Sequence, residues 1–303
     1  MLPIEIPLVA HCFWYGPYGL PYLRYLSIAS FAIHNPNIKL DIYTANDLRT
    51  GRAFDTHEQS VVHITKDFFS EIQALPNVAI KKVPDEFLSI IPFKMHTAVH
   101  VSDILRVWLL STVGGYWMDS DIIFTTSLDN SFISLPENNK VNTIIAQTSF
   151  GSICPYQTHR IGFLAASKKN NFFDDILQKI LVSDQGSDYQ AYGSLLYNAT
   201  YPEFNQIYNQ HPQIKILNLP NHVLYSMHLT ELLSDRISTR NFINNSHILG
   251  CHWYGGGDQL TKLVEVLNCA DDVERHLEDL YVKEPNFLLE LFSYACKLKS
   301  VIF

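Results

Sequence analysis

Residues 114–124 read GGYWMDSDIIF, an apolar and β-branched stretch that carries two carboxylates one residue apart. Aromatic and β-branched residues favour a β-strand, and the paired glycines in front of them allow a tight connection from a preceding helix. In a strand, Asp119 and Asp121 would point to the same side, about 6 to 7 Å apart at the backbone. Burying an unpaired carboxylate is costly, so the stretch predicts a strand whose end offers both carboxylates a binding partner.

A divalent cation is the partner that this acidic pair indicates, because two like charges held side by side repel each other. Carboxylate oxygens prefer a hard ion such as Mn²⁺ or Mg²⁺. An ion held by only two protein carboxylates keeps open positions, which a diphosphate can fill. The alternative is a solvated pair of aspartates in a turn, without a chemical role.

The elements that precede this strand predict the fold class. Apolar runs rich in β-branched residues alternate with stretches of helical spacing. The expected strands are residues 4–14, 38–44 and 78–83, and the expected helices are residues 20–34, 66–75 and 95–113. This alternation is typical of an α/β fold with a Rossmann-like, mainly parallel central sheet flanked by helices.

The rest of the chain continues the pattern and ends in helices. The expected strands are residues 141–147, 161–167, 214–219 and 247–251, with a helix at residues 171–181. From residue 258 onward the apolar spacing is helical throughout. We therefore expect one main domain over residues 1–257 and a helical C-terminal extension, residues 258–303, packed on the same domain.

Composition limits the classes of partner. The net charge is −8 and 47% of the residues are hydrophobic, so the chain can build a large core but lacks the basic field that attracts nucleic acid. Its five cysteines show no CxxC spacing, which favours reduced thiols over a disulfide framework. We recognise neither a signal peptide nor an apolar run of about 18 residues, and therefore expect a cytoplasmic protein.

A second charged pair lies in the expected helix before the acidic strand. Asp103 and Arg106 are three positions apart and so share one face of this otherwise strongly apolar helix. Such a pair is either a buried structural ion pair or the wall of a polar site.

At this point the sequence resembles a known family. The run SDILRVWLLSTVGGYWMDSD, residues 102–121, is similar to the S-D-x-x-R and G-G-x-Y-x-D-x-D signature of sugar-nucleotide glycosyltransferases with a DXD motif. These include the glucosylating domains of large clostridial toxins, the mannosyltransferases that initiate yeast outer chains, and α-1,4-glycosyltransferases. The resemblance implies a fold of the GT-A type.

Other segments carry the same resemblance. Residues 11–16, HCFWYG, resemble the first strand of the family, whose Trp stacks on the nucleotide base. Residues 160–173 look like the strand and helix that follow the acidic strand, and residues 192–195 stand where relatives have a segment near the donor sugar. Residues 247–253, HILGCHW, resemble a late segment in which a His is followed by Ser-Trp, but His252 occupies the serine position here.

The resemblance implies a role for each candidate residue. The catalytic candidates are Asp103, Arg106, Asp119 and Asp121. The nucleotide-binding candidates are Trp14, His11, Asp103, Arg106, Asp119 and Trp253. The metal ligands would be Asp119 and Asp121, with His247 or His252 as the third.

The implied reaction is the transfer of a hexose from a nucleoside diphosphate sugar, with retention of anomeric configuration and with Mn²⁺ or Mg²⁺ as cofactor. We expect a UDP-linked donor rather than a GDP-linked one. The acceptor stays open between a glycan, a lipid-linked oligosaccharide and a protein side chain. No residue is assigned as a nucleophile: Asp188 and Gln190 are candidates, and a mechanism in which the leaving phosphate deprotonates the acceptor needs none.

Two other functions remain open from the sequence. The same fold could bind a sugar nucleotide or a glycan without catalysis. A carboxylate pair with a divalent ion also serves phosphohydrolases, although no Gly-rich phosphate loop of the GxxxxGK[ST] type is present.

The role of the C-terminal segment, residues 284–303, is also open. It could cover the core, bind another protein, or make peripheral contact with a membrane.

Overall fold

The structure is a computed structural model of the whole chain. It describes residues 6–15, 19–45, 66–95, 97–134, 141–150, 154–227, 229–234, 239–255, 258–268 and 272–299.

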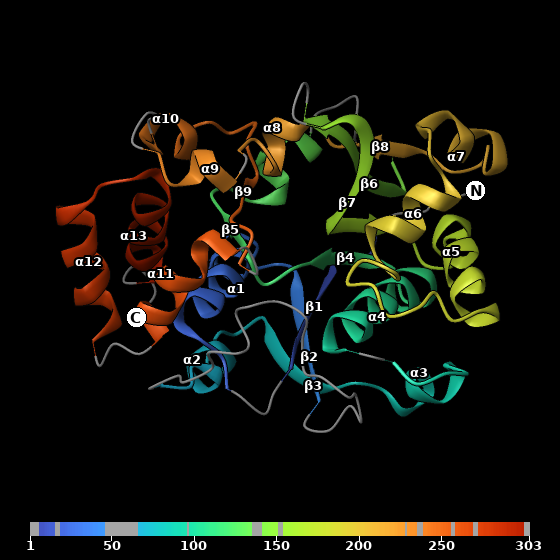
Figure 1. Cartoon of the computed structure of the whole chain (residues 1–303), viewed down its shortest axis with the longest axis horizontal. Coiled ribbons are helices and arrows are strands. Elements are labelled where there is room, and N and C mark those ends of the chain that lie inside the picture. The colour runs from blue at the N-terminus through green and yellow to red at the C-terminus, as the bar shows by residue number, and fades with distance from the viewer. Residues whose placement is uncertain are drawn as a thin grey trace.

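A central sheet of seven strands organises the molecule in the order β3-β2-β1-β4-β7-β6-β8 (Figure 1). Its strands are β1 (Val9–Tyr15), β2 (Lys39–Ala45), β3 (Val78–Lys82), β4 (Gly115–Met118), β6 (Thr143–Phe150), β7 (Cys154–Ala166) and β8 (Ile216–Asn218). Neighbouring strands are parallel from β3 to β4, antiparallel on both sides of β7, and parallel again between β6 and β8. The expected α/β fold with a mainly parallel sheet is confirmed.

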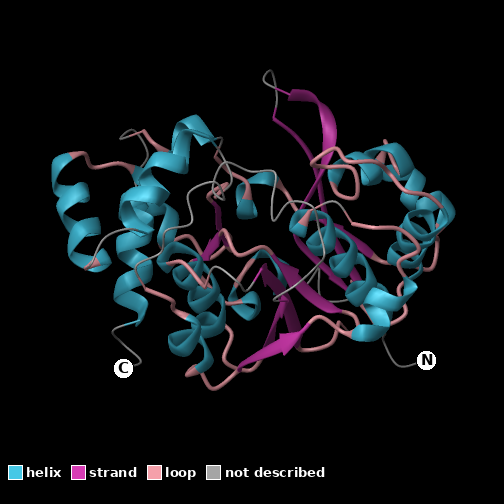
Figure 2. Ribbon diagram, turned by 60° about the horizontal axis from the view of Figure 1, so that its bottom comes forward, coloured by secondary structure: helices cyan, strands magenta, loops and turns pink. Residues whose placement is uncertain are grey.

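Helices cover both faces of this sheet (Figure 2). One face packs against α1 (Tyr22–His34) and α2 (Phe69–Gln73). The C-terminal helices α11 (Asp258–Asn268), α12 (Val273–Lys283) and α13 (Phe287–Lys299) belong to the same apolar cluster, where α11 and α13 contact α1. The other face packs against α3 (Asp85–Ile90), α4 (Ala98–Thr112), α5 (Asn171–Val182), α6 (Ser194–Thr200) and α7 (Phe204–Gln210). Short helices α8 (Asn221–Leu224), α9 (Leu229–Leu232) and α10 (Thr239–Ile243) precede the last strand. Helices α6 to α10 were not expected from the sequence.

The acidic stretch itself departs from the prediction, because it is not one strand. Strand β4 ends at Met118, and β5 (Ile122–Phe124) belongs to a separate two-stranded sheet with β9 (Gly250–His252). The chain therefore changes sheets at Asp119–Asp121, where it forms a turn. The alternation of sides along a single strand does not apply to the two carboxylates, and their orientation is set by separate contacts.

The connection from α4 to β4 depends on two glycines. Gly114 and Gly115 have φ values of +74° and +100°, which favour glycine strongly. A Cβ on Gly115 would lie 2.3 Å from the carbonyl oxygen of Val9, in the adjacent strand β1. The turn thus brings β4 close enough to pair with β1, which positions the acidic turn at the end of the sheet.

The C-terminal helices belong to the core. Phe287, Leu288, Leu291 and Phe292 of α13 are buried in the same apolar cluster as α1 and β5. This face of α13 therefore packs inward, as expected if the C-terminal segment covers the core. Within the described residues, none of the helices has the length and apolarity needed to cross a membrane.

The close approach at Gly115 can be tested against a glycine that has the same backbone conformation but open surroundings. Gly186 has φ +95° and no atom within 4 Å of an added Cβ. We expect Gly186→Ala to lower the free energy of unfolding by about 1 to 2 kcal/mol, through backbone strain alone. Gly115→Ala should lower it by roughly 3 kcal/mol or more, because strain and backbone overlap add. Urea unfolding of both variants measures the difference, and equal losses would contradict the proposed overlap with β1.

A buried histidine in β7 predicts sensitivity to acid. Burial lowers the pKa of His159 to about 4, although a bond to the Tyr201 carbonyl raises it in part. The unfolded chain has an ordinary histidine pKa of about 6.5, so it binds the extra proton first as the pH falls. This residue should therefore remove about 2 kcal/mol of stability between pH 7.5 and pH 5.0. Urea unfolding of His159→Gln at both pH values should show a smaller loss than the wild type; an equal loss would contradict this assignment.

Candidate active site

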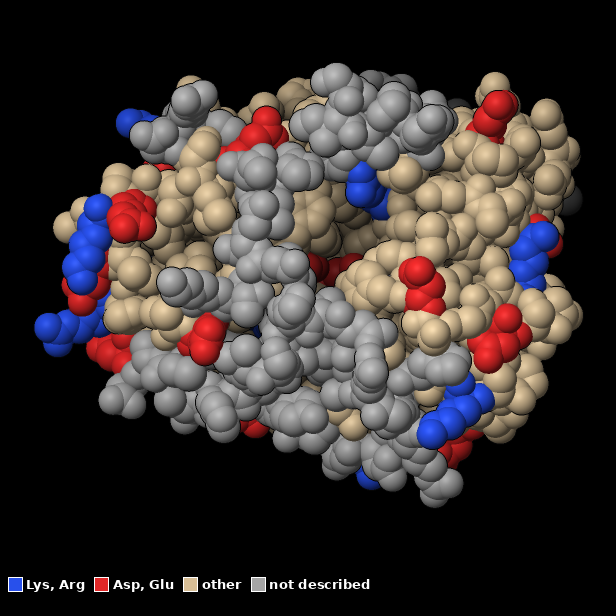
Figure 3. Space-filling model, viewed as in Figure 1, with Lys and Arg blue, Asp and Glu red and all other residues tan. Residues whose placement is uncertain are grey.

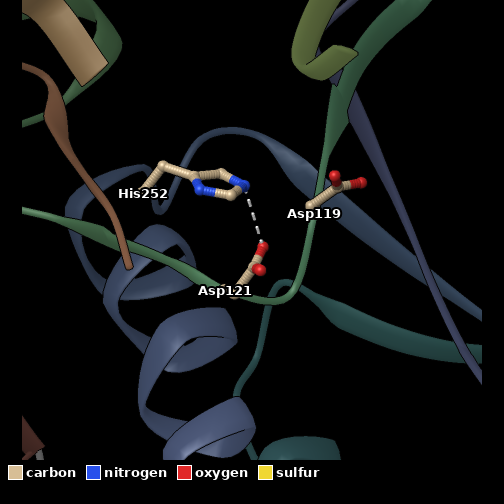
Figure 4. Close-up of side chains that lie close together, drawn as sticks. All are labelled: Asp119, Asp121 and His252. Atoms are coloured by element: carbon tan, nitrogen blue, oxygen red, sulfur yellow. Dashed lines mark ion pairs between the residues drawn. The ribbon is translucent and has the colours of Figure 1, made fainter. Parts of the chain in front are cut away.

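Three side chains from two parts of the chain converge beside the end of β4. One ligand atom each from Asp119, Asp121 and His252 can be chosen so that all three lie within 4.8 Å of one another. Figure 4 shows His252 and Asp121 directed toward each other, with His252 Nε2 at 3.3 Å from Asp121 Oδ1, and Asp119 beside them. Their side chains are 27%, 12% and 12% exposed, so the group is half-buried yet accessible.

Strand pairing explains why these residues meet. The Asp119 N–H donates to the Gly162 carbonyl of β7 over 2.7 Å, which extends the β4–β7 pairing by one residue. In the small sheet, Ile122 of β5 lies opposite His252 of β9. Gly162 leaves room between the ligands, because a Cβ there would lie 3.2 Å from both Asp119 Oδ2 and His252 Nε2.

Each aspartate uses one oxygen for a protein contact. Asp119 Oδ1 accepts hydrogen bonds from Arg106 Nη2 at 2.9 Å and from Trp117 Nε1 at 2.8 Å. Asp121 Oδ2 accepts one from the Gly255 N–H at 3.0 Å, with Arg24 Nη1 at 3.5 Å. Of the opposite oxygens, Asp121 Oδ1 lies 3.3 Å from His252 Nε2, and Asp119 Oδ2 lies with His252 Nε2 around the space beside Gly162. The arrangement therefore presents two carboxylate oxygens and one imidazole nitrogen toward one point.

The two carboxyls differ in their electrostatic surroundings. Burial raises the pKa of Asp119, Arg106 lowers it in part, and the neighbouring Asp121 raises it again. At Asp121 burial also acts to raise the pKa, but His252, Arg24 and the Gly255 N–H outweigh burial, so the pKa of this carboxyl is lowered. Asp121 is therefore the carboxylate that is more firmly ionised, as suits a cation ligand.

Asp103 and Arg106 lie directly behind Asp119. Arg106 Nη1 is 3.3 Å from Asp103 Oδ1, and both residues are 3% exposed. Burial raises the pKa of Asp103 to about 7, Arg106 opposes this shift, and Asp119 adds to it. Among the described residues, Asp103 Oδ2, Arg106 Nε and the buried Tyr197 hydroxyl have no hydrogen-bond partner. These unsatisfied polar atoms need a water or ligand partner.

Arg24 is a site residue that the sequence analysis missed. It lies in α1, is 7% exposed, and its guanidinium is 5.5 Å from the Trp14 ring centroid and 5.0 Å from that of Trp253. The side chain also donates from Nη1 to Ser120 Oγ at 3.3 Å. Arg24 thus joins the two predicted nucleotide-site tryptophans to the acidic turn. In the sequence, the feature that could have indicated this role is a single arginine within the otherwise apolar first half of α1.

The two remaining candidate histidines lie apart from this group. His11 is fully buried in β1, where burial lowers its pKa and Nε2 is 2.9 Å from the Gly114 carbonyl oxygen. His247 is exposed in the turn before β9, and its N–H donates to Asn245 Oδ1. His252 is thus the imidazole that adjoins both aspartates. The predicted nucleotide-binding role of His11 stays a prediction.

The segment between α5 and α6 borders the same site. A Cβ on Gly193 would lie 2.7 Å from Asp103 Oδ2, so the absence of a side chain there lets the segment approach α4. Tyr189 is 38% exposed, and burial together with Asp103, Asp121 and Asp119 raises the pKa of its hydroxyl. Figure 3 shows a hollow in this face of the molecule, with acidic atoms at its depth and basic atoms at its rim.

These side chains fit a divalent cation. Two carboxylate oxygens and one imidazole nitrogen suit Mn²⁺, and the carboxylates suit Mg²⁺ as well. Three protein ligands leave coordination positions open. The space beside Gly162 is the second feature that fits an ion, because any larger residue would place atoms against Asp119 and His252.

Comparison with known proteins places this site in context. Residues 49–193 match the family described as "Capsular polysaccharide synthesis protein", and this range includes the run at residues 102–121. The chain resembles glycosyltransferases. No curated protein matches it.

The chain also aligns with solved structures at low sequence identity. PaToxG glycosyltransferase is 16% identical, with 69% of this chain and 75% of that chain covered and a TM-score of 0.45. The glycosyltransferase GlyE of Streptococcus pneumoniae TIGR4 is 11% identical, with 93% and 65% covered and a TM-score of 0.46. The WbbM bifunctional glycosyltransferase is 10% identical, with 92% and 52% covered and a TM-score of 0.47. The alignments thus leave about a third of GlyE and about half of WbbM unmatched.

The contrast between two histidines of the same segment tests the ion site. We expect His252→Ala to weaken Mn²⁺ binding at least tenfold, because it removes the only imidazole near Asp119 and Asp121 among the described residues. His247→Ala is the matched control and should bind Mn²⁺ as the wild type does. Titration with Mn²⁺ followed by electron paramagnetic resonance measures the free ion directly. Equal affinities in the two variants would argue against the three-ligand group.

Proposed function

We propose that this protein is a metal-dependent, retaining glycosyltransferase of the GT-A type, which moves a hexose from a nucleoside diphosphate sugar to an acceptor. The observation that carries the proposal is the convergence of Asp119, Asp121 and His252, whose ligand atoms lie within 4.8 Å of one another. The family match over residues 49–193 supports a role in polysaccharide synthesis. We propose Mn²⁺ as the ion and a UDP-linked sugar as the donor.

The ion, when bound, would offset the negative charge that develops on the leaving diphosphate. Asp121 would bind the ion directly, because its carboxyl is the more readily ionised of the pair. Asp119 would present Oδ2 while Arg106 and Trp117 hold Oδ1, so its orientation is fixed before the donor arrives. His252 would complete the protein ligands in the position where the family resemblance expects serine.

The donor would lie between the ion and the polar atoms behind it. Asp103 and Arg106 have buried polar atoms without partners, and sugar hydroxyls would satisfy them. Trp14 would offer an aromatic face to the base at the C-terminal end of β1. Trp253 is fully buried and would contribute by holding Arg24 in place. Tyr189 is 38% exposed and feels the charge of the three aspartates, and it would contact the acceptor.

Retention of configuration is part of the proposal, although the described residues offer no evident nucleophile. The Asp188 side chain is exposed and accepts a hydrogen bond from the Gln190 N–H at 3.0 Å. Gln190 Oε1 accepts one from the Ser194 N–H at 3.2 Å, beside Gly193. We therefore favour a mechanism in which the leaving phosphate takes the acceptor proton and no protein nucleophile is required.

Thermal unfolding with a panel of UDP- and GDP-linked sugars, with and without Mn²⁺, tests the proposal. A donor at 100 times its Kd should stabilise the wild type by about 2.7 kcal/mol, which raises Tm by several degrees. Asp121→Asn should abolish the Mn²⁺-dependent part of this shift and keep the fold. Asp129→Asn, an exposed aspartate outside the site, is the matched control.

Analysis of the products then separates the competing functions. Mn²⁺-dependent release of free UDP or GDP from a bound donor supports transfer or its hydrolytic side reaction. A stabilising donor without any such release would favour a binding protein. Release of a sugar phosphate would instead favour a phosphohydrolase.

A further inference from the structure

Two guanidiniums reach the ion-facing carboxylates before any ion binds. Arg106 contacts Asp119 at 2.9 Å and also Asp103 at 3.3 Å, and Arg24 lies 3.5 Å from Asp121. Each ion-facing carboxylate therefore has a guanidinium beside it, and arginine stays charged at any working pH. Ion sites that bind a divalent cation by themselves gain affinity from the number of negatively charged ligands.

Arg24, unlike Arg106, takes no part in the proposed contacts to the sugar. It approaches Asp121 from α1, whereas Arg106 and Asp103 belong to α4. Its guanidinium lies near two tryptophan rings, with the Trp14 centroid at 5.5 Å and the Trp253 centroid at 5.0 Å. An aromatic environment of this kind stabilises the charge and holds it in place.

The surrounding backbone also fits this side chain closely. A Cβ on Gly255 would lie 2.5 Å from Arg24 Nη2, so the residue there must be small for the guanidinium to stay. The Gly255 N–H and Arg24 both reach Asp121 Oδ2. Arg24 thus carries a positive charge next to the ion ligand Asp121, and its contacts with the two tryptophans and with Asp121 hold the guanidinium in place.

We propose that Arg24 makes divalent cation binding at Asp119, Asp121 and His252 depend on a diphosphate that binds with the cation. A cation alone would add two positive charges to a half-buried group in which each ion-facing carboxylate already has a guanidinium beside it. A nucleoside diphosphate supplies the missing negative charge, so the two ligands raise each other's affinity. This inference rests on the proposed function, and it makes Arg24 a positioning and charge-balancing residue.

The test compares the affinity for Mn²⁺ alone with the affinity for Mn²⁺ in saturating UDP, both followed by electron paramagnetic resonance. Arg24→Met removes the charge and keeps a long apolar side chain between the tryptophans. We expect it to bind Mn²⁺ alone at least tenfold more tightly than the wild type, and to lose most of the increase that UDP brings. Arg24→Lys keeps the charge and should stay near the wild type in both affinities.

Two further variants serve as a charge control and as a substitute for Arg24→Met. Arg275→Met removes an equal charge from an exposed position in α12 and should change neither affinity. If Arg24→Met does not fold, as judged by circular dichroism, Arg24→Gln carries the same test with a neutral polar side chain.

The outcomes separate this inference from the proposed function. Weaker or unchanged binding of Mn²⁺ alone by the neutral Arg24 variants, in a protein whose wild type binds UDP with Mn²⁺, would overturn the inference and leave the function standing. A wild type that binds neither UDP nor GDP in the presence of Mn²⁺ would overturn both. Tighter binding of Mn²⁺ alone together with a reduced effect of UDP would support the inference.

Discussion

The repulsion between Asp119 and Asp121 is the constraint around which the site is built. Two half-buried carboxylates separated by one residue are tolerated only if positive charge reaches each of them. The fold supplies it from two different elements, Arg106 from α4 and Arg24 from α1. The site is thus a product of tertiary structure, although its two aspartates are near neighbours in sequence.

The change of sheets at this point follows from the same requirement. If the acidic stretch continued in the central sheet, both carboxylates would lie on one side of it and β9 would have no partner. Because β5 leaves to pair with β9, the pairing of Ile122 with His252 places an imidazole beside Asp121. The Trp253 N–H then donates to the Asp121 carbonyl at 2.9 Å, which fixes the end of β9 to the acidic turn.

The sequence predicted the parts of this arrangement that depend on local pattern. The alternation before residue 114 indicated β1, β2, β3, α1 and α4 with small errors at their ends, and helical spacing placed Asp103 beside Arg106. The change of sheets at Ser120 could not be predicted from the sequence, because the β-branched residues after it favour a strand in either sheet. Arg24 was missed for a similar reason, since it forms a hydrogen bond with Ser120 across 96 positions that no local pattern encodes.

The position of Arg24 connects the C-terminal helices to the chemistry of the site. Trp253, which lies against Arg24, donates from Nε1 to Ser27 Oγ of α1 at 2.8 Å. On its other side it packs edge-on against Phe292 of α13, with ring centroids 5.4 Å apart. Helix α13 also packs along α1 through the shared apolar cluster. The C-terminal helices therefore hold both α1 and Trp253, and through them they fix the guanidinium that faces Asp121.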